Sequence, residues 1–108
     1  MTPLNVRLDG DAKKVHSYIE GYYSLTSDPV NGKKYWIHVQ GLHAIWYNNE
    51  VKGWLIGSEK DKGTKRCSLY TSVSFSNDAK SPEEATTWAY FGANGHLMPT
   101  FNIFVLGM

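Results

Sequence analysis

The segment that most constrains the fold runs from residue 35 to residue 56 and holds three of the four tryptophans, Trp36, Trp46 and Trp54. Its apolar runs are five or six residues long, are rich in β-branched and aromatic types, and are bounded by Gly or Asn. This pattern is typical of β-strands joined by tight turns. Because each Trp or Tyr side chain buries roughly 150–250 Å², we expect this meander to supply much of the core.

Strand patterns also occur on both sides of the meander. Leu4, Val6 and Leu8 alternate with polar residues, which is typical of a half-buried strand. Gly21 interrupts a longer run, which indicates a bulge or a bend. The last strand is expected to pair near the first, because a closed sheet leaves no bare edge. We predict strands over residues 4–8, 15–25, 35–40, 42–47, 52–57, 65–75 and 100–106.

One stretch carries a clear helix start. Ser81 can cap a helix, Pro82 suits its first position, and Glu84 completes a capping box. Weak helix formers follow, so we expect one or two turns. Together with six to eight short strands at regular spacing, this indicates an all-β fold. We predict a mainly antiparallel sandwich or barrel with one short helical segment near residues 81–89.

Length and charge narrow the possibilities further. The chain of 108 residues is near the commonest domain size, so we predict a single β domain over residues 1–108. Eleven basic and ten acidic residues give a net charge of +1, which does not favour nucleic acid or a membrane surface as partner. The apolar runs are also far shorter than the ~20 residues of a spanning helix.

Three features favour the cytoplasm or another reducing compartment. The start of the chain has neither a basic nor an apolar signal region. Cys67 is the one cysteine, so no internal disulfide is possible, and no Asn-x-Ser/Thr acceptor occurs. A domain excised from a longer secreted protein would look the same, and that alternative stays open.

A series of short motifs runs through roughly residues 15–90 without any internal repeat. It resembles small Trp/Tyr-rich β modules that occur singly or repeated in multidomain eukaryotic proteins. No activity is known for such modules, so the resemblance implies a module rather than an enzyme. The motifs that carry it are Gly21-x-Tyr23, Asn31-Gly32-x-x-Tyr35, Trp46-Tyr47, Trp54-Leu55-Ile56, Ser81-Pro82 and Trp88.

No set of chemically active residues is complete. A zinc site needs three or four ligands, and no carboxylate or cysteine pattern accompanies the histidines. Cys67 alternates with apolar residues and is expected in the core, without an activating base. The helix start accounts for Glu83 and Glu84. The sequence therefore predicts no catalytic residue, metal site or cofactor, and it predicts four partly buried strand histidines: His16, His38, His43 and His96.

Aromatic content gives the strongest functional signal, with four Trp and seven Tyr in the chain. Exposed aromatic patches mark binding sites. We therefore expect a non-catalytic binding or interaction module, whose first candidate partner is a protein, with a homo-oligomer as one form. The outward-facing aromatic residues are expected among Tyr18, Trp36, Tyr47, Tyr70 and Trp88.

Two other functions stay open. A carbohydrate-binding, lectin-like module is the alternative, because aromatic rings stack on glycans while Asn, Asp and His side chains bind hydroxyls. The third is binding of single-stranded nucleic acid, or an unrecognised enzyme. Basic residues gather around one loop, as binding of single-stranded nucleic acid requires. Glu59 and Asp61 lower the net positive charge of that loop.

Loops on a rigid β scaffold usually carry function, so we place the site on the loops over residues 28–34, 40–43 and 48–52. If Gly41 is a true turn, the first and third of these loops emerge at the same end of the sheet. The simpler alternative is that Asn31-Gly32 and Asn48-Asn49 only turn the chain. The predicted ligand-binding residues are Asp28, Asn31, Lys33, Tyr35, His43, Tyr47, Asn48, Asn49 and Glu50.

Overall fold

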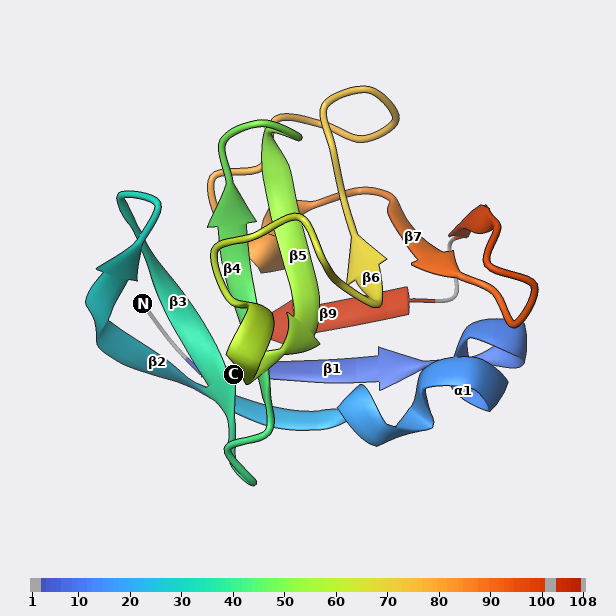
Figure 1. Ribbon diagram of the computed structural model, residues 1–108, viewed down its shortest axis with the longest axis horizontal. Helices are drawn as coiled ribbons and strands as arrows, with labels where there is room; N and C mark the ends of the chain where they lie inside the picture. The colour runs from blue at the N-terminus through green and yellow to red at the C-terminus, as the bar shows by residue number, and fades with distance from the viewer. Residues whose placement is uncertain (1–2, 101–102, 108) are drawn as a thin grey trace.

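A computed structural model of the protein describes residues 3–100 and 103–107. Its strands form one antiparallel sheet in the order β8-β7-β6-β5-β4-β3-β2-β1-β9, and the sheet curls into a nearly closed barrel (Figure 1). The all-β, antiparallel prediction is confirmed, with nine strands in place of six to eight. The strands are β1 (Leu4–Leu8), β2 (Gly21–Val30), β3 (Lys33–His38), β4 (His43–Asn48), β5 (Gly53–Ser58), β6 (Leu69–Tyr70), β7 (Trp88–Phe91), β8 (Leu97–Thr100) and β9 (Ile103–Gly107).

Helical structure is sparse in the described ranges. The one α-helix, α1 (Gly10–His16), lies at one end of the barrel (Figure 1). Short 3₁₀ helices make up the rest: η1 (Ser17–Ile19), η2 (Glu59–Asp61) and η3 (Pro82–Glu84). None of the helices in these ranges is long and apolar enough to cross a membrane.

Tight turns join the strands of the meander, as predicted. Asn31 and Gly32 take positive φ angles of 55° and 82°, as a two-residue type I′ hairpin turn requires. Gly41 has a φ of 78° between β3 and β4, which pair antiparallel. It is therefore a true turn, and the β2–β3 and β4–β5 turns lie at the same end of the barrel.

The first and last described strands pair with each other. β1 and β9 are antiparallel from Leu4 opposite Gly107 to Leu8 opposite Ile103. This confirms the expectation that the last strand lies near the first, although β9 begins at Ile103 and residue 100 ends β8. Residues 101 and 102 of the predicted strand lie outside the described residues. Within the described sheet, β8 and β9 are the edge strands.

The predicted strand over residues 15–25 is wrong in its first half, where α1 and η1 stand instead. Asp9 caps α1, its Oδ1 accepting the Gly10 N–H at 2.8 Å. The buried residues are Ala12, His16 and Ile19, at spacings of four and three, which is the helical period. The helix start was not predicted, because Asp9-Gly10-Asp11 is a sequence typical of a turn.

The predicted strand over residues 65–75 is reduced to β6, Leu69–Tyr70. Beyond β6 the hydroxyl groups bond to distant backbone. Thr71 Oγ1 donates to the Thr87 carbonyl and Ser72 Oγ to the Val51 carbonyl, both at 2.8 Å. These two bonds hold residues 71 and 72 against the backbone before β7 and before β5.

The helical segment near residues 81–89 is a single 3₁₀ turn, and the predicted capping box does not form. The Ser81 hydroxyl donates to the Glu83 carboxylate instead. β8 was not predicted, and it contains Pro99. Pro99 is tolerated in β8 because β8 is an edge strand, where a missing backbone N–H costs little.

One cluster of buried side chains fills the barrel around Trp36 and Trp54, whose ring centroids lie 5.7 Å apart in an edge-to-face contact. Trp54 Nε1 donates to the Ala79 carbonyl at 3.0 Å, which ties the loop before η3 to β5. The meander therefore does supply much of the core. The other large members are Leu4, Val6, Leu8, Ile19, Tyr23, Ile45, Ile56, Leu69, Trp88, Tyr90, Ile103 and Val105.

A second, smaller cluster lies on the outer face of β3, β4 and β5, and its buried members are Tyr35, Ala44, Trp46 and Leu55. The segment from η2 to residue 68 runs across this face (Figure 1). Trp46 Nε1 donates to the Thr64 carbonyl of that segment at 3.0 Å. This half of the outer face is thus covered by the protein's own chain, a segment we call the covering loop (residues 59–68).

Gly53 has no room for a side chain, since a Cβ there would lie 1.7 Å from the Thr71 carbonyl oxygen. We predict that Gly53→Ala lowers the free energy of unfolding by about 3 kcal/mol, as measured by urea denaturation. Gly95→Ala is the control, because its Cβ would meet nothing within 4 Å. Only the strain of its positive φ then remains, about 1 kcal/mol. Equal losses in the two variants would contradict the close approach of β5 to residue 71.

Candidate functional site

Three loops meet at one end of the barrel, and two of them belong to the predicted site. Asn31 Nδ2 donates to the Tyr47 carbonyl at 2.8 Å and to the Gly63 carbonyl at 3.0 Å. Asn48 Nδ2 donates to the same Gly63 carbonyl at 3.3 Å. The β2–β3 and β4–β5 turns therefore lie close together, and the covering loop is bound to both.

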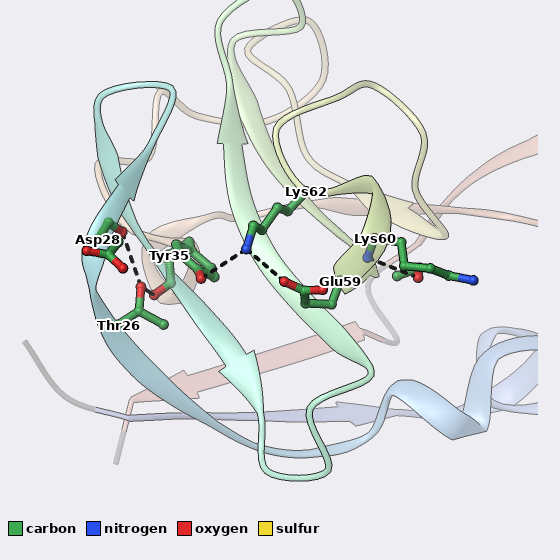
Figure 2. A network of polar contacts seen from close by, with 7 residues as sticks. Thr26, Asp28, Tyr35, Glu59, Lys60 and Lys62 are labelled. Atoms are coloured by element: carbon green, nitrogen blue, oxygen red, sulfur yellow. Dashed lines mark hydrogen bonds and ion pairs between the residues drawn. The ribbon is translucent and has the colours of Figure 1, made fainter.

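A lysine links the covering loop to β3, as Figure 2 shows. Lys62 Nζ lies 2.7 Å from Glu59 Oε1 and donates to the Tyr35 hydroxyl at 3.3 Å. The hydrogen bond to Glu59, followed by that to Tyr35, raises the pKa of Lys62. The ammonium also lies 5.0 Å from the centre of the Tyr35 ring, within the range of a cation–π contact. Lys62 thus holds the covering loop against the sheet.

Most polar groups of the predicted site are engaged within the protein. Asn48 Oδ1 accepts two backbone N–H groups of its own turn, at 2.9 and 3.1 Å. Glu50 pairs with Lys65 at 2.9 Å. Lys33 Nζ lies 4.9 Å from the centre of the Tyr47 ring. These contacts favour the simpler alternative, in which the turn residues hold the chain in shape.

The remaining predicted residues are scattered. Tyr35 is buried, whereas Asp28 and Asn49 are exposed beside the network. His43 lies at the other end of β4, where its ring is 5.1 Å from Tyr18. The structure therefore brings Asn31, Lys33, Tyr47, Asn48 and Glu50 together but leaves His43 apart.

Of the aromatic residues expected to face outward, only Tyr18 is exposed. Trp36 and Trp88 are buried in the barrel, and Tyr47 and Tyr70 are half-buried. The aromatic richness of the chain thus serves mainly to fill the two cores.

Histidine rings gather near the β3–β4 turn. His38 Nε2 donates to the Glu20 carbonyl at 2.9 Å, and its Nδ1 accepts the Gln40 N–H at 3.0 Å. The His43 ring lies 6.1 Å from that of His38, and burial, followed by His38, lowers the pKa of His43. Across residues 3–100 and 103–107, no three His, Cys, Asp or Glu side chains are placed to hold a metal ion.

His16 belongs to a chain of hydrogen bonds that joins α1 and η1 to the barrel. Its Nε2 lies 2.7 Å from the Phe91 carbonyl and its Nδ1 lies 3.1 Å from the Tyr18 hydroxyl. That hydroxyl lies 3.1 Å from Ser68 Oγ. Because a carbonyl only accepts, Nε2 carries a proton, and Nδ1 of the neutral ring accepts from Tyr18.

Cys67 is half-buried and packs against the outer cluster rather than in the barrel interior, where the alternation pattern placed it. Burial raises the pKa of its thiol to about 12. The thiol is therefore protonated at neutral pH, which is the opposite of what a nucleophile needs.

The outer face of β9, β1 and β2 carries exposed apolar side chains. In one row across the strands, Leu106 lies beside Asn5, and Asn5 lies beside Tyr22. Val39 extends the row, since its N–H bonds the Tyr22 carbonyl at 3.0 Å. Leu106 and Tyr22 are each 49% exposed, and Val39 is 65% exposed. We call Leu106, Asn5, Tyr22 and Val39 the open row.

A neighbouring row places Phe104, which is 44% exposed, beside Arg7. A pocket of about 260 Å³ lies over β1 and the start of β2. Glu20 contributes a carboxylate whose Oε2 accepts the Leu8 N–H at 3.0 Å. The pocket is lined by Asn5, Val6, Arg7, Glu20, Gly21 and Tyr22.

Asn5 is unusual on this face because it is polar and yet buried. It is only 7% exposed, and among the described residues its Oδ1 is the one buried side-chain nitrogen or oxygen without a hydrogen-bond partner. An unpaired buried acceptor costs about 1–3 kcal/mol.

Sequence reasoning missed this face, although one signal for it was present. In β9, Ile103 and Val105 point into the barrel, while Phe104 and Leu106 point outward. Apolar residues on both faces of a strand indicate that something packs on each side.

Comparison with protein-family models, with curated proteins and with solved structures found no match for this chain. Its function is therefore inferred from the geometry of its own surface.

Asn31 offers a test of whether the loop end is structural. We predict that Asn31→Gly, which keeps the positive φ, lowers the free energy of unfolding by about 1–2 kcal/mol, because two hydrogen bonds that join the three loops are lost. Asn49→Gly is the matched control, since Asn49 is exposed, and it should change stability by about 0.5 kcal/mol or less. Thermal denaturation followed by circular dichroism measures both. Equal effects would contradict a bracing role for Asn31.

Proposed function

We propose that the chain is a non-catalytic protein-interaction module whose partner binds across the outer face of β9, β1 and β2. One observation supports this: the rest of the chain covers the apolar side chains on one half of the sheet's outer face but leaves those on the other half exposed. Over β3, β4 and β5, large apolar side chains such as Trp46 are buried beneath the covering loop. Over β9, β1 and β2, apolar side chains stay about half exposed. A partner would complete the second half as the loop completes the first.

The exposed groups have the composition of an interface centre. Fully burying a Leu or Phe side chain contributes about 1.5–3 kcal/mol, so covering the exposed parts of Leu106, Phe104 and Tyr22 offers several kcal/mol towards association. Tyr is enriched among residues that dominate binding energy. Arg7, at the margin, suits the polar rim of an interface.

A capture experiment tests this proposal. The immobilised wild-type protein, exposed to an extract of its own cells, should retain a partner that Leu106→Glu does not retain. The reason is that burying an unpaired carboxylate in an apolar interface is strongly unfavourable. Mass spectrometry identifies and quantifies the retained proteins.

Val73→Glu is the matched control for this experiment. Val73 is 43% exposed and lies in the loop after β6, so this variant should retain the same partner as the wild type. Circular dichroism establishes that both variants fold. A partner retained equally by all three proteins would place the interface elsewhere, and failure to retain any protein would count against an interaction function.

The pocket beside Asn5 favours a second function, the binding of a carbohydrate. Tyr22 supplies a half-exposed ring for the C–H face of a sugar. Asn5, Arg7 and Glu20 supply planar groups that bind hydroxyls. A volume of about 260 Å³ is below the usual range for drug-sized ligands and fits a single sugar residue.

A glycan array followed by titration calorimetry tests the carbohydrate function. We predict that Tyr22→Ala weakens binding of any glycan found by about tenfold or more, because the stacking ring is lost. Tyr18→Ala is the matched control, since Tyr18 is similarly exposed but does not line the pocket. Absence of any bound glycan, or binding unchanged by Tyr22→Ala, would eliminate this function.

A further inference from the structure

We infer that His38 is an acid-sensitive switch, which holds the β3–β4 turn in shape while its ring is neutral and releases the turn when the ring is protonated. The turn spans residues 39–42 and carries Val39, at one end of the open row. The switch would therefore regulate the proposed protein interaction, and that consequence alone rests on the proposed function.

Two backbone groups set the protonation of the His38 ring. Nε2 lies 2.9 Å from the Glu20 carbonyl oxygen, which only accepts, so Nε2 carries a proton. Nδ1 lies 3.0 Å from the Gln40 backbone nitrogen, whose N–H only donates, so Nδ1 is unprotonated. These two bonds together require the neutral ring, and the bond to Gln40 depends on the lone pair of Nδ1.

Protonation of His38 would set two donors against each other. An imidazolium carries a hydrogen on both nitrogens, so neither nitrogen could accept from the Gln40 N–H, whichever way the ring turns. The ring is also confined, because it is buried edge-to-face against Tyr23, with 4.9 Å between the ring centroids. On its other side, a Cβ on Gly21 would lie 2.8 Å from Nε2. The turn, rather than the ring, therefore has to move.

The turn depends on hydrogen bonds to His38. Its ring accepts the Gln40 N–H, and its carbonyl accepts the Gly41 N–H at 2.7 Å. Val39 and Leu42, the apolar side chains of the turn, are 65% and 64% exposed. Because they bury so little surface, they hold the turn only weakly. Loss of the ring bond should therefore loosen residues 39–42.

The groups around His38 do not offset a positive charge on its ring. Those that titrate are Tyr23 on β2 and His43 on β4, whose ring centroid lies 6.1 Å away. Glu20 directs its carboxylate to the Leu8 N–H, and none of the ion pairs among the described residues includes His38. Burial, followed by the neighbouring His38, lowers the pKa of His43. A histidine pKa that is lower in the folded state makes stability fall as the pH falls, so His43 acts in the same direction.

His16 provides an internal comparison. Its Nε2 also bonds a backbone carbonyl, that of Phe91, but its Nδ1 bonds the Tyr18 hydroxyl rather than a backbone N–H. A hydroxyl both donates and accepts. Tyr18 can therefore accept from a protonated ring and donate to Ser68 Oγ, which lies 3.1 Å away. Protonation of His16 thus keeps its hydrogen bonds, whereas protonation of His38 breaks one.

Nitrogen-15 NMR on the labelled full chain tests the switch between about pH 8 and pH 5, where imidazoles usually titrate. At the upper limit, His38 should carry its proton on Nε2 and show a scalar coupling between Nδ1 and the Gln40 amide nitrogen. Protonation should abolish this coupling and raise hydrogen exchange at Gln40 by about tenfold, after correction for pH. Exchange at Phe91, beside His16, should stay within about threefold.

Two variants separate the neighbouring histidines. His38→Gln does not take up a proton in this range, so it should abolish the acid-induced loosening of residues 39–42. His43→Gln is the matched control and should retain the loosening, because the bond between His38 and Gln40 is still present. Circular dichroism establishes that both variants fold. If His38→Gln does not fold, the wild-type titration decides the outcome.

Four results would overturn the inference. They are a neutral His38 ring with its proton on Nδ1, a ring that stays neutral down to about pH 5, a turn that is unchanged while His38 titrates, and loosening that persists in folded His38→Gln. These measurements need no partner. A turn unaffected by acid would therefore remove the switch and leave the proposed function standing. Failure to capture any protein would remove the proposed function and leave the switch.

Discussion

The pairing of β1 with β9 is the contact on which the rest of the barrel depends. It joins strands from opposite ends of the chain and brings Ile103 and Val105 into the inner cluster with Leu4 and Val6. Without it, β9 would have no neighbour in the sheet. The entropy of closing so long a loop must be offset by burial in the core. The same closure determines the outer surface, because it places Leu106 beside Asn5.

The outer face shows two solutions to one physical problem, since a sheet with apolar residues on both sides needs cover on both sides. Over β3 to β5 the covering loop provides it. This loop is fastened by Trp46 to the Thr64 carbonyl, by Asn31 and Asn48 to the Gly63 carbonyl, and by Lys62 to Tyr35. Asn31 and Asn48, which belong to loops predicted to bind a ligand, have their side-chain amides engaged in these contacts. Over β9 to β2 the described chain supplies no equivalent cover.

The meander was predictable because its signals are local: short β-rich runs, with Asn31-Gly32 and Gly41 at positions that require positive φ. α1 was hidden because Asp9 and Gly10 read equally well as a turn. The roles of Asn31 and Asn48 depend on Gly63, which lies far along the chain, so no local pattern reveals them. The open face depends on which strand lies beside β1, and that is decided only when the barrel closes.

Asn5 leaves one buried acceptor without a partner, and its surroundings indicate why an amide is useful there. β9 is an edge strand, Ile103–Gly107, without a charge or a proline to discourage further strand pairing. A Leu at position 5 would join Leu106 and Tyr22 into an unbroken apolar stripe beside this edge, a combination that promotes aggregation. The amide interrupts the stripe at the cost of one unpaired acceptor. A polar group that lowers stability can thus limit non-specific association of an apolar face.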